Sequence, residues 1–181
     1  MADRKQTETQ ILDWLGQQRP AMTDLLERLV NIDSGSYNKA GVDAVGVAIE
    51  DWFAAEGIPT DRVPHGEFGD CIRAHVTGGE GNRPIILMGH RDTVFPDGTA
   101  TERPFTVEGD TAYGPGVADM KAGLVMNAFV LAAFKRFGGA PYPLLGLYTS
   151  DEEIASPSSR PVIENEARTA RVVFNAEPGR P

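Results

Sequence analysis

The stretch Ile85-Ile86-Leu87-Met88-Gly89-His90-Arg91-Asp92-Thr93 runs from four consecutive apolar residues directly into an imidazole and a carboxylate. A short, continuous apolar run is typical of a central strand that is buried on both faces of a sheet. We therefore predict a strand over residues 85–88 whose carboxyl end presents His90 and Asp92. A second apolar run, Leu144–Tyr148, predicts another buried strand, and Asp151-Glu152-Glu153 follows it.

The remaining segments alternate between helical and extended patterns. Helices are predicted over residues 8–32, broken near Pro20, and over 40–56 and 120–137. Ser156-Pro157 is predicted to open another helix, with serine as the N-cap and proline as the first residue. Further strands are predicted over residues 60–63, 71–76 and 171–175, and a hairpin over 105–113. The predicted fold class is therefore α/β, with helices on both faces of the sheet.

Composition limits the classes of partner and location. The 181 residues carry a net charge of -9, and the pI is about 4.8, so nucleic acid is not an expected partner. Cys71 is the single cysteine, which excludes an internal disulfide and predicts a packed core thiol. The polar first ten residues show no signal peptide, and no apolar stretch is judged long enough to span a bilayer. These features predict a cytoplasmic protein without a membrane partner.

His90 and Asp92 suit a metal site, although an alternative remains open. In an extended segment, residues two apart point the same way, so Asp92 could lie behind His90 and orient its imidazole. A loop histidine beside a helix-capping aspartate explains the same pair equally well.

Two other acidic positions precede or follow predicted core elements. Asp119 follows Gly114-Pro115-Gly116 and precedes an apolar helix, so on its own it is typical of an N-cap. A dinucleotide loop is rejected there because no third glycine stands at the required spacing. Asp151-Glu152-Glu153 emerges from a buried strand, where packing like charges is costly unless a cation neutralises them. One of these acids could bind metal while its neighbour stays free as a base.

Taken together, the four motifs resemble the co-catalytic zinc peptidases that include glutamate carboxypeptidase, acetylornithine deacetylase, succinyl-diaminopimelate desuccinylase and aminoacylase. The resemblance extends from about Leu25 to Glu177. It consists of Gly-His-x-Asp-Thr-Val after a strand, then Gly-x-x-Asp-Met-Lys-x-Gly, then Asp-Glu-Glu, then Glu-Pro. The segments 104–110 and 113–116 are most similar to the glutamate carboxypeptidase branch.

The resemblance implies a role for each residue of the site. His90 would bind a first metal and Asp92 would orient it. Asp119 would bridge two metals, and Glu177 would complete the ligands of the first. Glu152 would be the general base and Glu153 a ligand of the second metal. The expected cofactor is zinc, as two divalent ions in the full enzyme, with manganese or cobalt as alternatives, and the peptide bond after Asp119 is expected to be cis.

The resemblance also implies a larger protein. Residues 1–181 are expected to be the N-terminal segment of a catalytic domain. Its fold would be a three-layer, zinc-peptidase-like α/β fold with a mixed, mainly parallel sheet and helices on both faces, and the sheet would be incomplete in this chain. A lid and dimerisation domain and a C-terminal catalytic segment, which carries a final histidine ligand, would lie outside it. The expected activity is hydrolysis of an amide in an N-acyl amino acid or small peptide with a free carboxylate, by a homodimer.

Two alternatives to this activity are kept. The isolated chain is expected to bind at most one metal tightly and to be feeble in catalysis, so it could be a non-catalytic metal-binding or interaction fragment. A deaminase, or another aminohydrolase on the same scaffold, is the other alternative.

Overall fold

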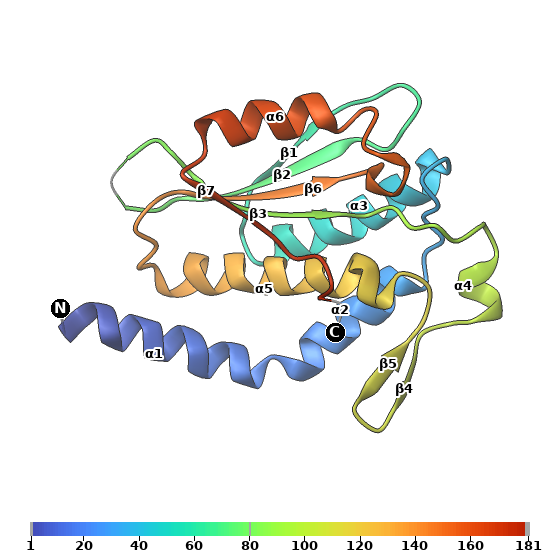
Figure 1. Cartoon of the computed structure of the whole chain (residues 1–181). Coiled ribbons are helices and arrows are strands. Elements are labelled where there is room, and N and C mark those ends of the chain that lie inside the picture. Colours follow the sequence, from blue (N-terminus) through green and yellow to red (C-terminus); the bar gives the residue numbers. More distant parts are fainter. Residues whose placement is uncertain (1, 80, 180–181) are drawn as a thin grey trace.

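The fold is built on one five-stranded mixed sheet (Figure 1), and the computed structural model describes residues 2–79 and 81–179. The strand order is β1-β2-β6-β3-β7. The strands are β1 (Thr60–Val63), β2 (Cys71–Val76), β3 (Ile85–His90), β6 (Leu144–Thr149) and β7 (Val172–Asn175). β3 pairs in parallel with both β6 and β7, whereas β1–β2 and β2–β6 are antiparallel. The carboxyl ends of β6, β3 and β7 therefore meet at one edge of the sheet.

Helices cover both faces of this sheet, which confirms the predicted α/β class (Figure 1). On one face lie α3 (Lys39–Ala55) and α5 (Ala122–Phe137), and α1 (Ala2–Gln17) and α2 (Arg19–Val30) pack against α5. The other face carries α6 (Arg160–Thr169). The short helix α4 (Thr99–Glu102) and the hairpin of β4 (Thr106–Glu108) and β5 (Thr111–Tyr113) project beyond the carboxyl edge.

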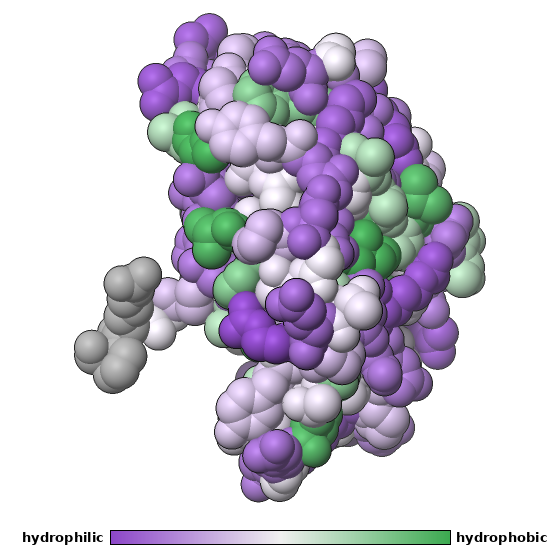
Figure 2. Space-filling model, turned by 90° about the vertical axis from the view of Figure 1, so that its right-hand side faces the viewer, coloured by the Kyte–Doolittle hydropathy of each residue, from purple (hydrophilic) through white to green (hydrophobic). Residues whose placement is uncertain are grey.

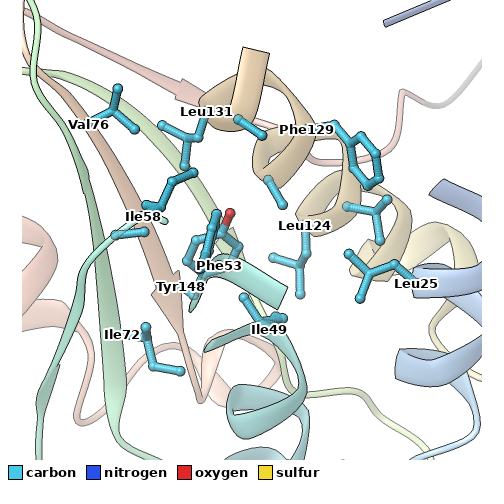
Figure 3. Packing of buried hydrophobic residues seen from close by; sticks show 14 of the residues in the cluster. Leu25, Ile49, Phe53, Ile58, Ile72, Val76, Leu124, Phe129, Leu131 and Tyr148 are labelled. Carbon is cyan, nitrogen blue, oxygen red and sulfur yellow. The ribbon is translucent and has the colours of Figure 1, made fainter. Parts of the chain in front are cut away.

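The main core fills the space between the sheet and helices α3 and α5 (Figure 3). Phe53 and Tyr148 meet there edge to face, with their ring centroids 5.7 Å apart. All six residues of β6 are buried, so β6 is the central strand of the sheet. The prediction of a central strand over residues 85–88 is wrong in this respect, because Ile85, Leu87 and Met88 are only half-buried. β3 lies beside the edge strand β7, whose four residues are all exposed.

The start of α6 also differs from the prediction. The helix begins at Arg160 rather than at Ser156-Pro157, and its N-cap residue is Ser159. The buried carboxylate of Asp151 accepts hydrogen bonds from the backbone N–H groups of Ser158 and Ser159. Ser156 has a φ of +56°, which is a left-handed conformation and does not belong to a helix. Asp151 therefore stabilises the turns before α6, and the helix begins at Arg160 instead of near Ser156.

The segment Val117–Phe137 corrects another expectation. Its 21 residues are long and apolar enough to cross a membrane, as judged by length and composition, whereas no such stretch was expected. However, 61% of its most apolar window is buried inside the molecule, where α5 packs between the sheet and α1 and α2. A core helix of a soluble fold meets the same criterion.

Candidate metal centre

The carboxyl edge of the sheet brings together side chains that are far apart in the sequence. His90 is the last residue of β3, and Glu177 follows β7. Asp119 lies in the kinked turn η1 (Val117–Lys121) before α5. One ligand atom from each of these residues lies within 4.8 Å of the others, a spacing that can hold a metal ion. The expectation that these three residues converge is confirmed.

The distances within this cluster match those between ligands of one zinc ion. His90 Nε2 lies 3.2 Å from Asp119 Oδ1 and 3.5 Å from Glu177 Oε1. Two donors at tetrahedral positions around zinc lie about 3.3 Å apart, given the usual zinc–ligand bond lengths. One imidazole with two carboxylates is also a donor set that zinc accepts. The residues present therefore fit a divalent metal.

The orientation of the His90 ring supports the same conclusion. Its Nδ1 lies 3.0 Å from the carbonyl oxygen of Asp92 and 3.3 Å from Asp92 Oδ1, and both oxygens can only accept. Nδ1 therefore donates to Asp92, and Nε2 is the ring nitrogen that faces the acidic cluster. A metal-binding histidine is held in this way by a carboxylate or carbonyl behind it.

Negative charge is crowded around Nε2. Glu152 Oε2 is the third carboxylate oxygen near this atom, at 3.7 Å. Burial alone would lower the pKa of His90, but the hydrogen bond and charge of Asp92, with the charge of Glu177, raise it to about 9. Burial raises the pKa of Glu177, and the charges of Asp119 and Glu152 add to this increase. In the metal-free chain the protonated His90 balances part of this negative charge, and a divalent ion bound at Nε2 would balance more of it.

Asp92 does more than orient the histidine. Its carboxylate is fully buried and also accepts hydrogen bonds from Ser36 Oγ at 2.7 Å and from the backbone N–H groups of Glu152 and Glu153 at 3.0 and 3.1 Å. Burial alone would raise the pKa of Asp92, but the hydrogen bonds from His90 and Ser36 outweigh this and lower it. Asp92 therefore fixes His90 and the Glu152-Glu153 turn together.

The three acids after β6 separate in the structure. Asp151 is buried and serves the turns before α6. The half-exposed carboxylate of Glu152 approaches His90. Glu153 stands outside the three-residue cluster and lines a neighbouring cavity. Its role as a ligand of a second metal therefore stays a prediction, as does the role of Glu152 as the base.

Two further residues that support the site were not identified from the sequence. Lys121 is buried, and its Nζ donates to the carbonyl oxygen of Ile32 at 2.8 Å, which ties the Asp119 turn to the end of α2. Burial lowers the pKa of Lys121 to about 8. Ser36 lies 56 residues from Asp92, its hydrogen-bond partner, so no local sequence signal could have paired them.

Two glycines allow close approaches at the site. Gly116 has a φ of +70° at the entry to the Asp119 turn, and the peptide bond between Asp119 and Met120 is cis, as the resemblance implied. A Cβ added at Gly123 would lie 2.4 Å from the carbonyl oxygen of Ala176. The absence of a side chain at position 123 thus lets the segment after β7 cross the start of α5 and deliver Glu177.

Comparison with known proteins identifies the family. A sequence model described as Peptidase family M20/M25/M40 matches residues 86–181, slightly more than half of the chain. This chain belongs to that family. The M20 chain is 37% identical over 164 residues to carboxypeptidase G2 from Pseudomonas sp. (strain RS-16), covering 89% of the chain and 39% of that protein. It therefore spans about two fifths of the length of this relative.

One further relative and one solved structure agree with this family assignment. Acetylornithine deacetylase from Vibrio vulnificus (strain CMCP6) is 34% identical over 154 residues, with 79% of the chain and 39% of that protein covered. The solved structure of the M20 family metallo-carboxypeptidase Sso-CP2 from Sulfolobus solfataricus aligns with a TM-score of 0.73 at 19% identity, over 87% of the chain and 37% of that one. The M20 chain thus has the fold of a metallopeptidase and, in its cluster of acids around His90, a candidate metal site.

We expect Ser36→Ala to lower the zinc affinity of this site about tenfold, because Asp92 would lose the hydroxyl that helps to hold it behind His90. Ser36→Thr keeps a hydroxyl and should restore most of the affinity. Ser34→Ala is the matched control, since the buried Ser34 Oγ has no hydrogen-bond partner within the described part of the chain. Competition with a chromophoric chelator measures all three variants, and equal losses in Ser36→Ala and Ser34→Ala would contradict the role of Ser36.

Proposed function

We propose that this chain supplies the first metal site and the general base of a metal-dependent hydrolase. The enzyme would cleave an amide bond in an N-acyl amino acid or a small peptide with a free carboxylate. The observation that carries the proposal is the position of His90 Nε2, which lies 3.2, 3.5 and 3.7 Å from carboxylate oxygens of Asp119, Glu177 and Glu152. Similarity to a carboxypeptidase and to a deacetylase supports this reaction class.

In this proposal, His90, Asp119 and Glu177 hold the first divalent ion, with zinc as the favoured metal and manganese or cobalt as alternatives. A divalent metal bound there lowers the pKa of water and polarises an amide carbonyl. Asp92 keeps the Nδ1 proton of His90 in place, so that Nε2 remains a ligand. Glu153 and the second carboxylate oxygen of Asp119 would serve a second ion.

Glu152 is the proposed general base. Its carboxylate lies beside the ligand cluster yet is half exposed, so it can take a proton from the attacking water and pass it to the leaving amine. The hydrogen bond from its backbone N–H to Asp92 Oδ1 holds it in this place. Because this hydrogen bond involves the backbone N–H and not the carboxylate, the side chain of Glu152 can gain and lose a proton while the residue stays in place.

The proposal extends to the whole protein, because the chain covers only 39% of its relative carboxypeptidase G2. We propose that residues 1–181 act as the N-terminal segment of a catalytic domain, together with a lid and dimerisation domain and a C-terminal catalytic segment in a homodimer. A cytoplasmic location without nucleic-acid or membrane partners completes the proposal. The net charge of -9 supports the part that concerns nucleic acid.

We expect zinc titration of the metal-free 181-residue chain to show one tight equivalent, because one ligand cluster is assembled and Glu153 lies outside it. Calorimetry gives the stoichiometry, and a panel of N-acyl amino acids tests hydrolysis by the zinc-loaded chain and by any longer polypeptide that contains it. Absence of tight zinc binding would refute the proposal. One tight equivalent without turnover in any form would favour a metal-binding segment, and ammonia release without acyl cleavage would favour a deaminase.

A further inference from the structure

A cavity of about 610 Å³ opens beside the candidate metal centre. Its walls come from the loop of residues 35–38, the loop of residues 93–97, and the turn η2 (Glu152–Ile154). Glu153 lines the cavity, so the cavity begins where the acidic cluster ends. A group bound beside the metal centre can therefore extend into it.

Much of the cavity wall is apolar. Tyr37, Val94, Phe95, Pro96 and Ile154 line it. Tyr37 and Val94 are 78% and 67% exposed, so their apolar surface is open to a ligand. Figure 2 shows that apolar residues on the side of α4 and the β4–β5 hairpin are scattered among hydrophilic ones. The cavity itself gathers five residues with apolar surface in one place.

The charge of the cavity selects against anions. Its charged lining residues are Asp97 and Glu153, and no lysine, arginine or histidine lines it within residues 2–79 and 81–179. The guanidinium of Arg103 lies 5.2 Å from the centre of the Phe95 ring but does not line the cavity. A carboxylate placed here would meet like charges without a cationic partner.

Asp97 is engaged within the protein. Its Oδ1 accepts a hydrogen bond of 2.6 Å from Asn38 Nδ2, and Asn38 in turn accepts from the backbone N–H of Gly41 at the start of α3. This carboxylate therefore has a structural partner already. An uncharged apolar ligand suits the cavity better than a cation does.

The walls of the cavity are fixed by the backbone. Thr93 N–H donates to Ser34 O at 2.9 Å, Asn38 N–H donates to Gly35 O at 2.7 Å, and Gly35 pairs with Thr93 in a parallel bridge. A Cβ at Gly35 would lie 2.8 Å from Phe95 O, so the two loops are in close contact. The cavity is therefore preformed, and its shape can discriminate between ligands.

We propose that this cavity binds the uncharged, apolar acyl group of the substrate, an inference that rests on the proposed amide hydrolysis. Cleavage of an N-acyl amino acid separates an acyl group from an amine that carries the free carboxylate. Asp97, whose hydrogen-bond partner Asn38 is uncharged, repels that carboxylate, so the amino-acid side points away from the cavity and the acyl side enters. Tyr37, Val94 and Ile154 then supply the apolar surface that the acyl group covers.

The test measures binding rather than turnover, so its outcome is separate from that of the proposed function. The zinc-loaded chain is titrated with N-acetylglycine, N-hexanoylglycine, N-(6-aminohexanoyl)glycine and N-adipoylglycine, and the methyl NMR signals of Val94 and Ile154 are followed. We expect N-hexanoylglycine to bind at least about tenfold more tightly than N-acetylglycine, because each buried methylene adds to affinity. N-(6-aminohexanoyl)glycine, whose acyl group ends in an ammonium, and N-adipoylglycine, whose acyl group ends in a carboxylate, should not show this increase in affinity.

Variants show whether the gain arises in the cavity. Val94→Ser and Tyr37→Ser should reduce the preference for N-hexanoylglycine over N-acetylglycine severalfold, because the longer acyl group covers more of their apolar surface. Val107→Ser is the matched control, since Val107 is 51% exposed on the β4–β5 hairpin and does not line the cavity. The proposal would be overturned if all four probes bound equally, if N-hexanoylglycine binding were undetectable, or if N-(6-aminohexanoyl)glycine showed the larger gain in affinity. Identical effects of Val94→Ser and Val107→Ser would also overturn it. Apolar selectivity without hydrolysis of any amide would instead reject the proposed reaction and keep the binding site.

Discussion

Glu152→Gln is expected to lower kcat at least about a hundredfold while the protein keeps its zinc. The variant is made in a polypeptide that contains this chain and hydrolyses an amide. Glutamine preserves the size of the side chain and the backbone hydrogen bond from residue 152 to Asp92. It cannot accept a proton from water. The first ligand cluster, of His90, Asp119 and Glu177, does not include residue 152, so metal content should stay constant. Steady-state kinetics beside metal analysis of the same samples measures both quantities.

Glu153→Gln is the comparison for this result. Both variants remove one negative charge from adjacent positions, and both keep the backbone N–H groups that bind Asp92. Because Glu153 faces the cavity rather than Nε2 of His90, its variant should lower occupancy of a second metal and retain the first. Equal metal loss in the two variants would show that the two roles are assigned wrongly.

Gly123→Ala should weaken zinc binding by about ten- to a hundredfold, the range found when the supports of metal ligands are altered. The added methyl group would lie 2.4 Å from the carbonyl oxygen of Ala176 and 2.9 Å from Met120 Cε. The flexible methionine can move, whereas the backbone at position 176 can yield only by carrying Glu177 away from His90. Zinc competition measures the loss, and circular dichroism shows that the helices persist.

Gly16→Ala is the control for this substitution. It makes the same chemical change inside α1, where nothing lies within 4 Å of the new Cβ. Alanine in an open helical position should stabilise the protein slightly, by about 0.5–1 kcal/mol, and leave zinc affinity untouched. Wild-type zinc affinity in Gly123→Ala would mean that Glu177 is not a ligand or that its segment shifts freely.

The positions of the strands were predictable because short apolar runs bounded by turn residues are typical of strands. The runs before His90 and before Asp151 became β3 and β6, and the acidic residues beyond them lie at the carboxyl edge. The order of β3 and β6 within the sheet was not predictable, since it depends on which other strands pair with each of them. That order places β6 at the centre, although both runs are equally apolar.

Other features depended on contacts that no local pattern records. Ser156-Pro157 has the composition of a helix start, but the carboxylate of Asp151 binds the backbone of Ser158 and Ser159 and moves the start to Arg160. The hydroxyl of Ser36 reaches Asp92 across 56 residues. These hydrogen bonds form only after helices and strands have packed together, so only the folded structure shows them.

The parallel pairing of β3 with β6 and β7 has a consequence for the size of ion that the site accepts. Neighbouring strands lie about 4.8 Å apart, so ligands that leave adjacent strand ends begin at a separation that one small cation can bridge. Residues inserted between strands, as in the β4–β5 hairpin, leave this separation unchanged. A deletion of one residue within β3 would instead move His90 by about 3.3 Å along the strand and turn its side chain to the opposite face. The approach of Glu177 to His90 therefore tolerates variation in the length of the connecting loops, whereas it depends on strand register.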